Sequence, residues 1–141
     1  MTPRQKMLVQ TTFAQVAPIA DTAAALFYNR LFELDPALRP MFTTDIEKQG
    51  RKLMQMLAVA VAGLDDLTAL VPAVRALGKR HVGYGVQDAH YEAVADALIW
   101  TLATGLGDAF TLEVRDAWAT VYWILADTMK EGAAEPLART A

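Results

Sequence analysis

The stretch LVPAVRALGKRHVGY (70–84) carries an apolar helical stripe that ends on one histidine, His81. Just beyond it, Gly83 and Gly85 are expected to end the helix. An imidazole in this place can be an axial metal ligand, or a core-edge histidine bonded to a backbone carbonyl. The stripe leading to it has the spacing of one helix face and consists of Leu67, Leu70, Val71, Val74 and Leu77.

Composition narrows the class of protein around this stretch. The chain has 141 residues, which indicates one domain, and 54% of them are apolar, which is enough for a large core. The net charge of -3, without a basic block, argues against nucleic-acid binding. The absence of cysteine and serine excludes thiolate sites and serine triads. With no signal peptide and no apolar run near the roughly 18 residues of a membrane span, we expect a soluble cytoplasmic protein.

Apolar spacing predicts an all-α domain over residues 1–132, followed by a flexible tail over 133–141. Thr2 and Gln5 form a capping-box pattern before the first helix, and Asp35-Pro36 ends the second. Gly105–Asp108 is expected to be a turn, and Gly132 is expected to stop the last helix. The six main helices are expected over 3–17, 21–34, 46–62, 67–82, 88–103 and 112–132, with one short helical turn over 36–42.

The polar residues within apolar stripes indicate what the site can do. Two histidines cannot form a three-histidine metal site, and there is no HExxH motif. One imidazole and an apolar pocket suit haem, because the porphyrin itself supplies four nitrogen ligands to the iron. His81 is preferred to His90 as the ligand, because His90 falls in the first turn of a helix, where exposure is expected. Tyr28 and Gln49 are donors on otherwise apolar stripes; alternatively, they are a core tyrosine and a solvated glutamine.

Five segments then resemble one known family, the globins, and specifically single-domain bacterial haemoglobins related to the globin part of flavohaemoglobins. They span nearly the whole chain in the family's order: LFYNRLFELDPALRPMF (26–42), KQGRKLMQML (48–57), ALGKRHVGYGV (76–86), HYEAV (90–94) and DAWATVY (116–122).

The resemblance implies a globin fold around haem b, with His81 as the proximal iron ligand. Tyr28 and Gln49 correspond to the residues that act on bound gas, and are therefore the candidate catalytic residues. Leu53 pairs with Gln49 on the distal side, and Phe42 corresponds to the phenylalanine that stacks on haem. The remaining residues implied to contact the cofactor are Leu57, Leu77, Val86, Tyr91, Val94 and Tyr122, with Tyr91 as the proximal tyrosine.

The family further implies that O2, NO and CO bind at a pentacoordinate-type iron, with Tyr28 and Gln49 stabilising the bound gas. The expected roles are oxygen storage or delivery, or nitric oxide detoxification with electrons from a separate flavin reductase. A gas or redox sensor and a haem-free helical interaction module are the alternatives. In the sequence, the place of the flavohaemoglobin proximal glutamate falls on Ala133, with Glu131 and Glu135 two residues away. A strong electron push from the proximal side is therefore not expected.

Overall fold

The computed structural model describes residues 1–42, 45–83 and 88–133, with the backbone alone at 41, 81–83, 88 and 133. Within these residues every regular element is helical, as the sequence predicts. The elements in chain order are α1 (Pro3–Val16), η1 (Ala17–Ile19), α2 (Ala20–Leu34), η2 (Pro36–Met41), α3 (Ile46–Ala62), η3 (Gly63–Asp66), α4 (Leu67–Gly83), α5 (Asp88–Leu106), η4 (Gly107–Ala109) and α6 (Leu112–Ala133).

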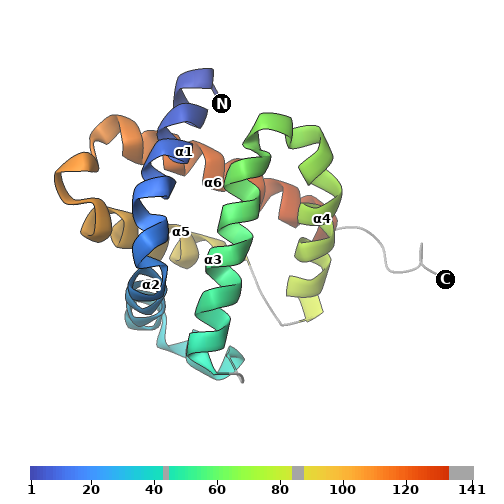
Figure 1. Cartoon of the computed structure of the whole chain (residues 1–141). Helices are drawn as coiled ribbons and strands as arrows, with labels where there is room; N and C mark the ends of the chain where they lie inside the picture. The colour runs from blue at the N-terminus through green and yellow to red at the C-terminus, as the bar shows by residue number, and fades with distance from the viewer. Residues whose placement is uncertain (43–44, 84–87, 134–141) are drawn as a thin grey trace.

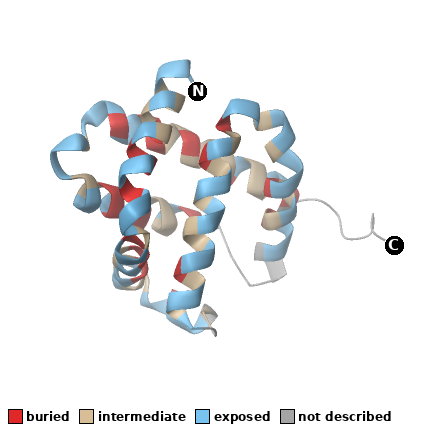
Figure 2. Cartoon of the chain, in the orientation of Figure 1, coloured by how far each residue is buried: buried red, intermediate tan, exposed pale blue. Residues whose placement is uncertain are grey.

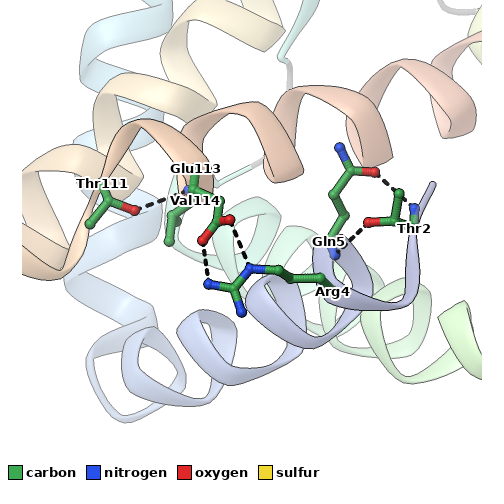
Figure 3. Close-up of polar contacts among 6 residues, drawn as sticks. All are labelled: Thr2, Arg4, Gln5, Thr111, Glu113 and Val114. Carbon is green, nitrogen blue, oxygen red and sulfur yellow. Dashed lines mark hydrogen bonds and ion pairs between the residues drawn. The ribbon is translucent and has the colours of Figure 1, made fainter.

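The first and last helices begin at side-chain caps that the sequence predicts. The Gln5 amide N–H donates to the Thr2 hydroxyl at 3.1 Å, and the Thr2 N–H donates to the Gln5 side-chain oxygen at 2.9 Å. This reciprocal pair provides acceptors for backbone amides that find none within the first turn of the helix. At the start of α6, the Val114 N–H donates to the Thr111 hydroxyl at 3.2 Å (Figure 3).

An ion pair joins these two helix starts. The Arg4 guanidinium donates to both carboxylate oxygens of Glu113, at 2.7 and 2.6 Å (Figure 3). Because both side chains are exposed, the pair contributes little to the stability of the fold.

The end of α5 differs from the sequence prediction. The helix continues to Leu106, so the turn expected from residue 105 begins two residues later. The physical reason is the backbone conformation, since among the described residues it is Gly107 that has a positive φ, at 56°. Gly105 stays helical, which costs only about 1 kcal/mol relative to alanine.

The core lies between the packed faces of the helices. α2 packs against α5 and α3, while α1 and α4 both pack against α6. Buried residues gather on the facing sides of these helices, and α3 shows mainly exposed and half-buried positions (Figures 1 and 2). The fully buried centre includes Val9, Leu31, Ala97, Ala117, Trp118 and Val121.

The segment from α3 to α4 is apolar but poorly buried. An 18-residue window within Ile46–Arg80 has a mean hydropathy of 1.7, and only 17% of it is buried, so by length and composition this segment could cross a membrane. From the sequence we expected no apolar run long enough to span a membrane. This segment nevertheless has a high mean hydropathy, because the window averages over occasional polar residues. In this fold the segment does not form one straight rod, since η3 divides α3 from α4 and the two helices turn back on one another (Figure 1).

Candidate functional site

Tyr28 lies at the centre of an aromatic cluster made of Phe27, Tyr28, Phe32 and Phe42. Its side chain is only 3% exposed. The Tyr28 ring meets Phe27 edge-on at a centroid distance of 5.1 Å and Phe42 edge-on at 5.4 Å, and it stacks on Phe32 at 6.0 Å. Three of these rings share one face of α2, and Phe42 joins them from the end of η2. The cluster therefore holds the Tyr28 ring on several sides.

Burial also sets the chemistry of the Tyr28 hydroxyl. Loss of solvent raises the pKa of Tyr28 to about 12, and a weaker hydrogen-bonding interaction with the Gln49 side chain acts in the opposite direction. A phenol with this pKa is protonated at neutral pH, so it can donate a hydrogen bond. The structure thus brings together the two distal polar residues predicted from the sequence, Tyr28 and Gln49.

A close helix crossing explains why Gln49 reaches Tyr28. A Cβ atom added at Gly50 would lie 2.8 Å from the Ala24 Cβ, closer than real Cβ atoms approach. The same added atom would lie 4.0 Å from a ring carbon of Tyr28. Glycine therefore allows the first turns of α3 to lie directly on α2, and this contact places Gln49 beside the aromatic cluster.

Leu53 and Leu57 continue the apolar face of α3 beyond Gln49, and both are half-buried. Met56, predicted to share that face, is instead 42% exposed. Leu53 and Leu57 also line an internal cavity of about 20 Å³, room for a water-sized molecule and far smaller than haem. The cavity lining is otherwise Phe13, Val16, Ala23, Phe27, Met54, Leu98, Thr101, Leu102 and Trp118.

On the opposite side of the predicted site, His81 falls in the last turn of α4. Its side chain lies outside the described residues, as does all of Val86. Leu77, one helical turn before His81, is half-buried. Among the described residues, no group of three His, Asp or Glu side chains could hold a metal ion. His90, the rival ligand, is half-buried in the first turn of α5.

A hydrogen bond links the side chain of Tyr122 to the backbone of Tyr91. The Tyr122 hydroxyl donates to the backbone carbonyl of Tyr91 at 2.6 Å. Burial raises the pKa of Tyr122 above its ordinary value of 10.0, so this hydroxyl stays protonated. Tyr91 is buried and Val94, one turn later on α5, is half-buried. The bond from Tyr122 therefore anchors the start of α5, where the proximal tyrosine was predicted.

Lys130 is a residue that sequence reasoning missed. Its ammonium lies 5.1 Å from the ring centroid of Tyr91 and 5.2 Å from that of Trp123. The signal in the sequence is the separation of seven residues between Trp123 and Lys130, which places both on one face of α6. Glu131, a candidate for the proximal glutamate, instead pairs with Arg75 at 3.3 Å. Glu135 lies outside the described residues, and the cation of Lys130 contacts the Tyr91 ring.

Comparisons with known proteins agree with this arrangement. The sequence model of the globin family matches residues 25–129. The chain belongs to the globin family. A flavohemoprotein from Xylella fastidiosa (strain Temecula1) is 31% identical over 132 residues, or 92% of this chain, and one from Bordetella parapertussis is 33% identical over 133 residues. This globin spans about one third of the length of these flavohemoproteins, since 33% of each is covered.

Two further proteins match this chain over nearly their whole length. Neuroglobin from Danio rerio is 28% identical over 146 residues, covering 94% of this chain and 92% of neuroglobin. A solved structure described as a hexacoordinated heme protein from an anhydrobiotic tardigrade superposes with a TM-score of 0.86 at 20% identity, with 96% of each chain covered. At that identity the superposition establishes the fold, and it confirms the all-α globin architecture predicted from the sequence.

Proposed function

We propose that this globin binds haem b between α3 and α4, with His81 as the only protein ligand of the iron. The described residues fit such a group. Leu53 and Leu57 on α3 and Leu77 on α4 are apolar side chains that the rest of the chain leaves half-buried. α3 packs on α2 while α4 packs on α6, so separate parts of the core support the two helices. When bound, haem would supply the iron at which a diatomic gas is held.

The observation that carries the gas-binding proposal is the pairing of Tyr28 with Gln49. O2 bound in a globin acquires partial negative charge, so hydrogen-bond donors favour it. The Tyr28 hydroxyl is kept protonated by burial, and the aromatic cluster fixes its ring. Gln49 lies beside it and supplies an amide. Each donor to a partly charged ligand contributes about 1–3 kcal/mol, so together they favour slow release of O2.

We therefore propose high-affinity binding of O2, with storage or delivery as the role. Conversion of nitric oxide is a further proposed activity, and it would require electrons from a reductase. NO and CO would occupy the same place, but CO carries less negative charge and should benefit less from Tyr28 and Gln49. A sensor role would use the same binding step without turnover.

The test is the rate of O2 release from the ferrous protein. Tyr28→Phe removes the hydroxyl and keeps the ring, and a loss of 1–3 kcal/mol corresponds to release about 5- to 150-fold faster. Thr104→Val is the control, because it removes an exposed hydroxyl that donates only to the Trp100 carbonyl. Unchanged release from Tyr28→Phe would remove the role proposed for this residue.

The cofactor assignment has its own test. Absorption spectra of the ferric, ferrous, oxygenated and CO-bound protein should carry a Soret band, and His81→Ala should change them. A purified chain with no Soret band after haem is supplied would instead favour a haem-free interaction module. Unchanged haem binding and spectra in His81→Ala would eliminate His81 as the ligand.

A further inference from the structure

α4 and α6 approach so closely that two positions in their contact have room only for glycine. A Cβ atom added at Gly78 would collide with the Met129 carbonyl oxygen and lie 2.6 Å from its carbonyl carbon. A Cβ atom added at Gly132 would collide with the Arg75 carbonyl oxygen and lie 2.7 Å from its Cα. In both cases the obstacle is backbone, so no side-chain rotation can relieve it.

These two contacts are reciprocal and define one register. Gly78 lies three residues after Arg75 on α4, and Met129 lies three residues before Gly132 on α6. A step along α4 is therefore matched by an equal step back along α6, as expected for antiparallel helices in contact. Prediction from the sequence placed Gly132 as the residue that stops the last helix, but α6 continues to Ala133. The described helix therefore ends one residue after Gly132, and this glycine also allows the close packing of α4 on α6.

Extending the register by one more step reaches the predicted iron ligand. His81 follows Gly78 by three residues, and Ala126 precedes Met129 by three. Ala126 is small and only 2% exposed. The side of α6 that faces the end of α4 therefore carries no bulky side chain that would separate the two helices. It consists, in succession, of Gly132, the Met129 backbone and Ala126.

We propose that Gly78, Gly132 and Ala126 are positioning residues that set how deeply α4 lies on α6, and through it the position of His81 relative to the iron. This inference rests on the proposed function, in which His81 binds haem. Helix pairs that pack through side chains are usually 8–10 Å apart and can adjust by changing rotamers. A contact of backbone on backbone lacks that freedom, so it fixes α4 more firmly.

The experiment measures the iron–imidazole stretching band of the ferrous, haem-loaded protein by resonance Raman spectroscopy. Gly78→Ala and Gly132→Ala should each shift this band, because each added methyl forces α4 away from α6. Gly105→Ala is the matched control: it also lies within a helix, but its Cβ would be 3.7 Å from the Ile19 Cδ1, an ordinary contact. The control should leave the band in place.

A third variant covers the case in which neither glycine variant folds. Ala126→Val adds two methyl groups opposite the end of α4 without entering the Gly78 and Gly132 contacts, and it should also shift the band. Thermal unfolding of each variant is recorded alongside. If the contact only stabilises the fold, a variant that disrupts it would unfold at a lower temperature but leave the band unchanged.

The outcomes separate this inference from the proposed function. If the wild-type protein shows an iron–imidazole band and His81→Gly retains it, the ligand assignment fails. If the band is present and depends on His81, but is unchanged in every α4–α6 variant that folds, the positioning role is overturned and the proposed function stands. A shift in these variants with none in Gly105→Ala supports the positioning role.

Discussion

Replacement of Thr12 by valine should destabilise the protein much more than the same replacement at Thr101. The two residues are the buried polar residues of the described core, at 5% and 4% exposure. Each hydroxyl donates to the carbonyl four residues earlier, at 2.7 Å for Thr12 and 2.8 Å for Thr101. Only Thr12 also accepts a hydrogen bond, from the indole nitrogen of Trp118 at 2.9 Å.

The Thr12 hydroxyl also reaches the Val9 carbonyl at 3.3 Å, but it has only one proton to donate, so the indole hydrogen bond gives the expected magnitude. Both substitutions exchange a hydroxyl for a methyl group of similar size, so the gain from burying a methyl and the loss of one bond to a helix carbonyl are common to both. Thr12→Val additionally leaves the indole N–H of Trp118 without an acceptor, and Trp118 is 2% exposed. An unsatisfied buried donor costs about 1–3 kcal/mol. For a chain of this size the difference corresponds to roughly 3–12 °C in unfolding temperature.

The assay is urea unfolding of both variants in the same haem state, followed by tryptophan fluorescence and by circular dichroism. The slope of the free energy of unfolding against urea should be equal in the two variants, which shows that both unfold from the same compact state. Thr101→Val should be near neutral, since its added methyl faces the apolar cavity that Thr101 lines. If Thr12→Val is as stable as Thr101→Val at equal slopes, the indole hydrogen bond contributes nothing and the reasoning is wrong.

Two predictions concern pH. Burial raises the pKa of Tyr28 to about 12 from its ordinary value of 10.0, so the folded state favours the neutral phenol. The resulting contribution to the stability of the fold is complete below pH 10, and it is lost as pH rises through 12. The phenolate absorbance present in wild type but missing from Tyr28→Phe should therefore titrate near pH 12 in the folded protein, and a midpoint near 10 would contradict the burial. The hydrogen bond from Arg4 lowers the pKa of Glu113 below its ordinary 4.5, so the contribution of this pair is present above pH 4.5 and disappears as pH falls through the lowered value. Wild type should lose slightly more stability than Glu113→Gln between pH 5 and 3, and equal losses would show that the pair contributes nothing.

Most helix boundaries could be predicted from the sequence because local chemistry determines them. The capping box at Thr2 and Gln5, the Asp35-Pro36 step and the Thr111 cap each depend on neighbouring residues only. The aromatic cluster was also accessible, since Phe27, Tyr28 and Phe32 recur at helical spacing. Their placement against Phe42 follows once the short η2 turn is recognised.

The roles of the glycines could not be predicted in this way. Gly105 and Gly132 both looked like residues that end a helix, and each lies one residue before the last described residue of one. What distinguishes them is the distance to other helices, since a Cβ atom at Gly132 would meet the backbone of α4, whereas one at Gly105 would make only an ordinary contact with the Ile19 side chain. A single sequence contains no record of that distance. Lys130 was missed for a related reason, because Tyr91 reaches it from a different helix.

The glycine contacts also imply that the two sides of the proposed haem site are supported independently. On the distal side, Gly50 allows α3 to lie on α2, and that contact determines where Gln49 stands relative to Tyr28. On the proximal side, Gly78 and Gly132 hold α4 on α6. α2 and α6 both pack against α5, so a displacement at one crossing has to pass through well-packed core before it reaches the other. The strength of the bond from His81 to iron and the stabilisation of gas by Tyr28 and Gln49 should therefore respond to different substitutions, which a single flexible pocket would not allow.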